Sequence, residues 1–103
     1  MNKRITRIVK MEFESIHNKL FVEKFNQHAL KMKAVPGCMS IELVKDIHTS
    51  STTFFTISVW RHEADLNVYR ESELFNLIWS ELKPLFCAQP QAWTTQSIYH
   101  AKH

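Results

Sequence analysis

With 103 residues, the chain is expected to form a single domain (residues 1–103), and an apolar content of 45% provides for a substantial core. A formal charge of +3 is too small to indicate a nucleic-acid-binding protein, although Lys3, Arg4, Arg7 and Lys10 form a basic run. No apolar run approaches the roughly 20 residues of a membrane span. Two distant cysteines and the lack of a secretory leader predict a cytoplasmic protein without disulfides.

The first third of the chain predicts a strand and then a helix. Residues 5–13 alternate imperfectly between apolar and polar positions, as a half-buried strand does. Ser15 is the expected N-cap of a helix over residues 16–33, because its hydroxyl can accept from free amides of the first turn. The apolar stripe of this helix consists of Phe21, Phe25, His28, Ala29 and Met32. Pro36 and Gly37 end the helix.

A β-hairpin follows the first helix. Residues 39–47 and Thr53–Trp60 alternate as strands, and the hydroxyl-rich residues 48–53 predict the turn between them. The second strand, expected at the centre of the sheet, carries large apolar side chains on both faces, with Phe55 on one and Phe54 on the other. A sheet with one solvated face does not need apolar side chains on that face, so we expect both faces of this sheet to be covered.

The last third predicts a second helix and a fourth strand. Residues 63–82 have helical spacing with an interruption at Glu71 and Ser72, where the serine can cap a new turn, and residues 93–99 alternate. The resulting order is βαββαβ, which predicts an α+β, ferredoxin-like antiparallel sheet with helices on one face. The bare apolar face then predicts a homodimer, paired through a two-fold contact.

Three segments carry a family resemblance. They are VPGC at residues 35–38, ISVW at residues 57–60 with charged residues after it, and YRESELF at residues 69–75, with a serine and an aromatic three positions on. In this order and spacing the chain resembles the antibiotic biosynthesis monooxygenase (ABM) domain family of the dimeric α+β barrel superfamily. The resemblance implies a homodimer with back-to-back sheets and a pocket between sheet and helices. Some members oxidise polycyclic phenols or quinols with molecular oxygen and no cofactor, and others degrade haem.

The cofactor-free reaction needs a dry aromatic cavity, an orienting group and a proton acceptor. We therefore expect an aromatic small molecule, a polycyclic phenol or quinol, between the sheet and the second helix. The expected substrate-binding residues are Trp60, Phe75 and Trp79. The expected catalytic residues are Tyr69 and His62 for proton transfer and Arg70 for holding an oxyanion. Aromatic side chains at helical spacing more often form core, so the alternative is a non-catalytic dimeric module that binds a ligand or another protein.

Other cofactors and partners have little support in the sequence. The positions where haem-degrading members carry Asn, Trp and an axial His correspond to about Val9, Tyr69 and Trp79, and none matches. The histidines lack the i, i+4 spacing of a shared metal. The strand TTFFTISVW lacks the glycine of RNA-recognition modules. Cys38 and Cys87 resemble small buried hydrophobes rather than reactive thiols. From these observations together, no metal, cofactor, nucleic acid or membrane is expected.

Overall fold

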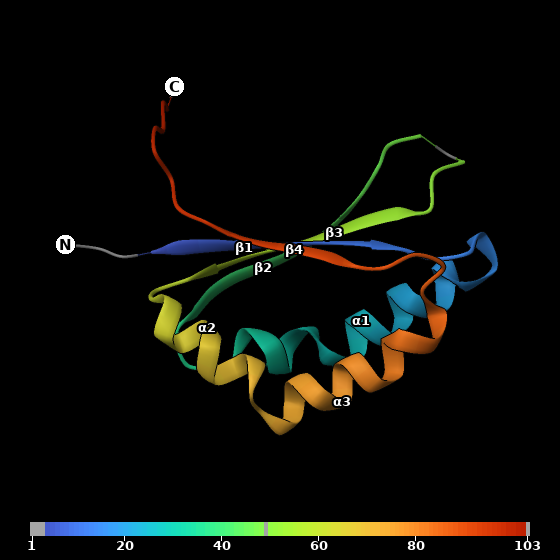
Figure 1. Ribbon diagram of the computed structural model, residues 1–103, viewed down its shortest axis with the longest axis horizontal. Coiled ribbons are helices and arrows are strands. Elements are labelled where there is room, and N and C mark those ends of the chain that lie inside the picture. The colour runs from blue at the N-terminus through green and yellow to red at the C-terminus, as the bar shows by residue number, and fades with distance from the viewer. Residues whose placement is uncertain (1–3, 49, 103) are drawn as a thin grey trace.

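A computed structural model describes residues 4–48 and 50–102, and its helices lie together on one face of a four-stranded antiparallel sheet (Figure 1). The strands are β1 (Ile5–Glu12), β2 (Cys38–Lys45), β3 (Thr53–Trp60) and β4 (Gln91–Thr95). The helices are α1 (Asn18–Lys33), α2 (Glu63–Arg70) and α3 (Glu73–Leu82), with 3₁₀ turns at Ser15–His17 and Lys83–Leu85. The strand order β2-β3-β1-β4 confirms the predicted ferredoxin-like arrangement and the internal position of β3.

The interruption expected near Ser72 is present and divides the second helical region. Ser72 has an extended backbone between α2 and α3, and its hydroxyl oxygen accepts from the Phe75 amide at 3.2 Å. The same hydroxyl donates to the carbonyl of Tyr69 at 2.6 Å. One side chain therefore gives a partner to the free Phe75 amide at the start of α3 and adds a hydrogen bond to the Tyr69 carbonyl, which also accepts from the Ser72 amide at 2.9 Å.

Several predicted element boundaries are wrong. Ser15 lies inside a 3₁₀ turn, and His17 occupies the N-cap position of α1 without a side-chain bond. β2 ends at Lys45 rather than at residue 47. The fourth strand occupies Gln91–Thr95 rather than residues 93–99, because it pairs with β1 from Lys10↔Gln91 to Thr6↔Thr95. Since β1 begins at Ile5, the later residues run past the end of their partner strand.

Three expected features involve residues beyond the described ranges. Lys3 of the basic run, position 49 in the turn at residues 48–53, and the last histidine of the chain lie outside residues 4–48 and 50–102. Among the described residues, no helix combines the length and apolar content needed to cross a membrane.

The core between sheet and helices consists of two clusters. The first gathers around Phe13, Phe21 and Phe54, and Phe13 extends β1 through an isolated bridge to Phe86. The second gathers around Trp60 and Tyr69 at the opposite end of the sheet. The two clusters are joined through Leu74, which packs against both.

The turn before β2 fits closely against α2. Gly37 has a φ of +88°, which strongly favours glycine, and a Cβ at this position would collide with the side chain of Asp65. The carbonyl of Gly37 also accepts from the Arg61 amide at 2.8 Å, just before α2 begins. The turn therefore sets where the second helix starts.

The sheet face turned away from the helices is markedly apolar. One cross-strand row on this face runs Glu42–Ile57–Ile8–Trp93 from β2 to β4. Phe55 and Val59 flank Ile57 on the same face of β3. Figure 1 shows none of the helices on this side.

Candidate aromatic cavity

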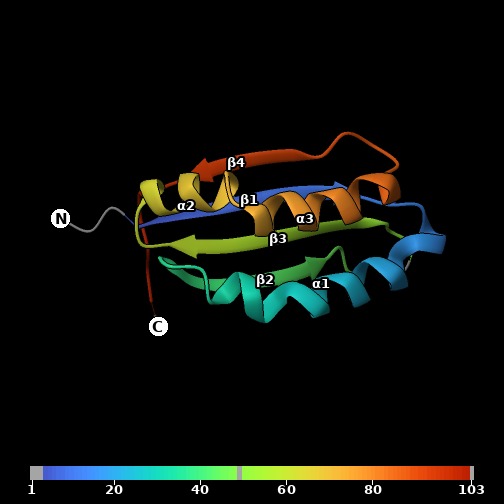
Figure 2. The same cartoon turned by 90° about the horizontal axis from the view of Figure 1, so that it is seen from below.

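A cavity of about 90 Å³ lies between the sheet and the helices. Its lining comes from both core clusters, including Met11 and Phe21 from the first and Trp60 and Tyr69 from the second. The side chains of the two clusters do not completely fill the layer between the sheet and the helices, and the cavity is the space that remains. Figure 2 shows α1 and the α2–α3 segment side by side across the strands, so the interior is covered by two separate helical segments.

The floor of the cavity follows from the strand register. Ile41, Ser58 and Arg7 are neighbours across β2, β3 and β1 and all line the space. Thr56 and Val9 form the next row in the same way. Because alternate residues of a strand share a face, two rows from three strands meet beneath the helices.

An aromatic chain forms one wall. Trp60 and Tyr69 stack with ring centroids 5.3 Å apart, and Tyr69 meets Phe75 edge-on at the same distance. Trp79 continues the chain at 5.8 Å from Phe75. The indole N–H of Trp60 donates to the Ser58 hydroxyl at 2.9 Å, so its polar edge is satisfied inside the protein. The four rings thus offer apolar surface.

Tyr69 is the buried phenol of this wall. Burial, with a smaller contribution from the Cys38 thiol, raises the pKa of Tyr69 to about 12. At neutral pH the side chain therefore keeps its proton. It can donate a hydrogen bond to a ligand, but it is a poor proton acceptor.

Two arginines, Arg7 from β1 and Arg70 from the last turn of α2, also line the cavity. Arg7 is half-buried, whereas Arg70 is exposed. Burial and then the nearby positive charge of Arg70 lower the pKa of Arg7. Arg7 Nη1 donates to the Thr94 hydroxyl of β4 at 2.8 Å, which fixes its guanidinium on the β4 side of the floor.

Five of the six expected site residues line this cavity, and one does not. They are Trp60, Tyr69, Arg70, Phe75 and Trp79. His62 is exposed at the N-cap position of α2 and borders a separate surface hollow with Ile5 and Thr94. β3 ends at Trp60, and His62 lies beyond it. The alternation that turns every second residue of β3 toward the helices therefore does not place the His62 side chain.

Sequence reasoning missed Arg7 as a cavity residue. Its signal was present, because Arg7 has the same strand parity as Ile5 and Val9 and so breaks an apolar face with a charge. It also missed Cys38, which is buried in the second cluster and lines the cavity. Burial raises the pKa of the Cys38 thiol, which keeps it protonated and unreactive at neutral pH.

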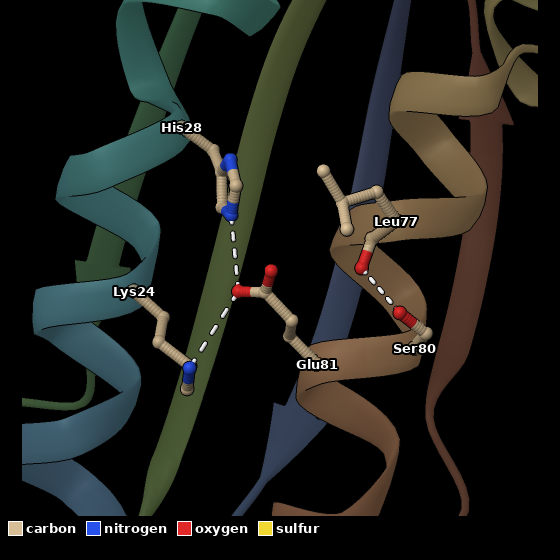
Figure 3. Close-up of polar contacts among 5 residues, drawn as sticks. All are labelled: Lys24, His28, Leu77, Ser80 and Glu81. Atoms are coloured by element: carbon tan, nitrogen blue, oxygen red, sulfur yellow. Dashed lines mark hydrogen bonds and ion pairs between the residues drawn. The ribbon is translucent and has the colours of Figure 1, made fainter.

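A polar clasp joins α1 to α3 beside the cavity (Figure 3). His28 Nε2 donates to Glu81 Oε1 at 3.1 Å, and Lys24 Nζ lies 3.6 Å from the same oxygen. His28 lies in α1 between Phe25 and Met32, and both of these line the cavity. The clasp therefore holds the two helical segments together where they cover the interior.

The chemistry available here is apolar binding with positive charge. No Asp, Glu or His is among the described residues that line the cavity, and residues 4–48 and 50–102 contain no group of three His, Cys, Asp or Glu suited to a metal. An engineered cavity of about 150 Å³ holds benzene, so the present volume admits a ring system only after side chains rotate. The lining can orient an aromatic anion once it enters.

Solved structures with this fold come from several bacteria. SnoaB, a cofactor-independent oxygenase from Streptomyces nogalater, has a TM-score of 0.86 at 13% identity, with 98% of this chain and 99% of that chain covered. PA3566 from Pseudomonas aeruginosa has a TM-score of 0.82 at 20% identity, covering 96% and 98%. Rv0793 from Mycobacterium tuberculosis has a TM-score of 0.84 at 12% identity, covering 97% and 100%. At these identities the likeness shows the fold.

Sequence comparison is more specific about the family. No curated protein matches the chain. The family model described as "Antibiotic biosynthesis monooxygenase" matches residues 4–78, which include β1 through most of α3 and therefore most of the cavity wall. The chain belongs to the antibiotic biosynthesis monooxygenase family.

Proposed function

We propose that the protein is a cofactor-independent monooxygenase of an electron-rich hydroxyarene, which binds in the cavity between the sheet and the second helical region. The observation that carries the proposal is the aromatic wall of Trp60, Tyr69, Phe75 and Trp79 around an internal space, with Arg70 at its edge. Family membership and the oxygenase activity named for the structural neighbour SnoaB support the same chemistry.

The reaction balances without a reductant. A phenol or anthrone with a reactive C–H position loses its hydroxyl or carbon proton to give an anion, and this anion reduces dioxygen by one electron. Recombination of the two radicals forms a C–O bond, and the resulting peroxide anion takes a proton from solvent to give a hydroperoxide. Loss of water then leaves a carbonyl, so one oxygen atom enters the quinone and the other leaves in water.

The protein's contribution is to stabilise the anion and orient it. No imidazole or carboxylate is among the described residues that line the cavity, and Tyr69 keeps its proton, so the substrate proton passes to solvent. Arg70 lowers the energy of the oxyanion by its charge, and the aromatic wall holds the ring plane. Tyr69 donates a hydrogen bond in this scheme and does not act as a base.

The proposal includes a cytoplasmic homodimer. The apolar row of Ile57, Ile8 and Trp93 on the outer sheet face supports pairing through that face, since a monomer would leave it in water. The free thiols of Cys38 and Cys87 are compatible with a reducing compartment.

Oxygen uptake tests the activity. The purified protein is mixed with dithranol, 1-naphthol and a naphthalenediol in turn, and dioxygen consumption and quinone formation are measured against the buffer rate. We expect stoichiometric conversion of dioxygen to quinone with at least one substrate. A Trp79→Ala variant should lose most of the rate, whereas Leu77→Ala, at an exposed position of the same helix outside the cavity lining, serves as the control. No rate above buffer across the panel would remove the activity.

The second candidate is a non-catalytic ligand-binding module. The narrow volume and the lack of a proton acceptor on the described cavity wall favour it. In this case a quinol would raise the thermal unfolding temperature or quench Trp60 fluorescence without consuming dioxygen. The two measurements on the same samples separate the candidates.

A further inference from the structure

Two arginines, Arg7 and Arg70, line one cavity, and no acidic residue is among the described residues that line it. Arg70 is close enough to Arg7 for its charge to lower the pKa of Arg7. Among residues 4–48 and 50–102, neither arginine forms an ion pair with a carboxylate. Glu71 and Glu73 follow Arg70 in the chain, but both are exposed and neither is among the lining residues.

This arrangement carries an electrostatic cost. Like charges in a partly desolvated site repel each other, and Arg7 is half-buried on the apolar face of β1. Among the described residues, the one side-chain acceptor of the Arg7 guanidinium is the Thr94 hydroxyl, at 2.8 Å. An arginine carries five N–H donors in a planar fork that fits a carboxylate, so most of the Arg7 donors have no partner in the described part of the chain.

The chain also places these donors beside the aromatic wall. Arg70 directly follows Tyr69 in α2, and Tyr69 stacks on Trp60. On the floor, Arg7 is the cross-strand neighbour of Ser58, whose hydroxyl is already occupied by Trp60. A ligand with its ring against the aromatic wall would thus direct its substituents toward the two guanidiniums.

We propose that the ligand is an aromatic acid, specifically a hydroxyarene carboxylate whose carboxylate and adjacent phenolic oxygen lie between Arg7 and Arg70. This inference rests on the proposed function for its choice of a hydroxyarene, and it adds a permanent negative charge to the substrate class. The carboxylate compensates the repulsion between the two arginines, and the neighbouring phenolic oxygen accepts a hydrogen bond from the second guanidinium.

The test measures binding separately from turnover. Salicylate and 1-hydroxy-2-naphthoate are each compared with their methyl esters, which have nearly the same shape but no charge, by isothermal titration at about pH 7.5, where the carboxyl groups are ionised. We expect at least one acid to bind about tenfold or more tightly than its ester. Arg7→Gln and Arg70→Gln should each remove that preference. Arg61→Gln is the matched control, because Arg61 pairs with Asp65 outside the cavity and should keep it.

Folding of each variant is checked by thermal unfolding, and Arg7→Lys provides a second variant that keeps the charge. The lysine variant should retain part of the preference, since it loses the planar fork alone. Equal binding of acids and esters, or no binding of either acid, overturns the inference. Oxygen uptake with neutral naphthols but no acid preference overturns it while leaving the proposed function. Acid-selective binding without oxygen uptake supports the inference and removes the oxygenase activity.

Discussion

Trp60 and Tyr69 stack at 5.3 Å although one ends a strand and the other lies in the helix after it. The short connection between β3 and α2 folds the helix back over the strand, and this contact closes one end of the cavity. Both residues are buried, so the stack is part of the core as well as of the candidate site. A substitution that removes the Tyr69 ring should therefore affect both the stability of the fold and any chemistry in the cavity. Only a substitution that keeps the ring separates the two effects.

Tyr69→Phe keeps the ring and removes the hydroxyl. The folded-state pKa of about 12 lies above the ordinary value of 10, so Tyr69 stabilises the fold below pH 10 and loses that contribution as pH rises toward 12. The loss amounts to roughly 2–3 kcal/mol. Urea unfolding at several alkaline pH values should show this decline in the parent protein and a smaller one in Tyr69→Phe. If the hydroxyl donates to the substrate, turnover at neutral pH should also fall about tenfold or more.

Ser72→Ala removes the bond that starts α3. We expect the free energy of unfolding to fall by about 1 kcal/mol, because the Phe75 amide loses its partner and the Tyr69 carbonyl loses one of its donors. For a domain of this size the melting temperature should fall by about 4–8 °C. Ser80→Ala is the control, since the Ser80 hydroxyl donates to the Leu77 carbonyl within the same helix and has no other bond among the described residues (Figure 3). An equal loss in both variants would contradict the capping role.

Glu81→Gln tests the clasp between α1 and α3. The hydrogen bond from His28 and the charge of Lys24 lower the pKa of Glu81, so its contribution to stability is present above the ordinary carboxyl value and is lost as pH falls through the folded-state pKa. The variant should be less stable than the parent at neutral pH, and the difference should vanish at acidic pH. Denaturant unfolding across this range measures it. Glu23→Gln, on the exposed side of α1, should show no such convergence.

Ile57→Lys tests pairing through the outer sheet face. Ile57 lies at the middle of the Glu42–Ile57–Ile8–Trp93 row, where a charge would lie in the centre of a sheet-to-sheet contact. We expect the dimer dissociation constant to rise about thirtyfold or more, measured by sedimentation velocity over a concentration series. Val68→Lys, at an exposed position of α2, is the matched change on the helical side. A parent protein that is monomeric at all concentrations would refute the dimer.

The sequence pattern predicted correctly those elements that depend on residues close together in the chain. The division of the second helix follows from Ser72 and its neighbours, and the internal position of β3 follows from apolar side chains on both of its faces. The limits of β4 could not be found in this way, because they depend on where β1 begins. Ser15 failed as an N-cap because a 3₁₀ turn precedes α1, and the sequence pattern does not distinguish the two kinds of helix there.

The cavity was predictable in its aromatic half and not in its charged half. Tyr69, Phe75 and Trp79 were found because apolar residues at helical spacing face one way, and Trp60 was found as the end of the apolar strand before them. Arg7 was grouped with the basic run near the N-terminus, although its parity places it on the inner face of β1. His62 was included for its chemistry alone, and the change of direction after Trp60 leaves it outside. Strand parity decided the case of Arg7, and the end of β3 at Trp60 decided that of His62.

The absence of a side chain at Gly37 lets the turn before β2 lie close against α2. A methyl group there would collide with the side chain of Asp65 in the first turn of α2, and the other end of that helix carries Tyr69 and Arg70, which line the cavity. A larger residue at this turn would therefore bear on the helix that forms part of the cavity wall, although Gly37 is not among the lining residues.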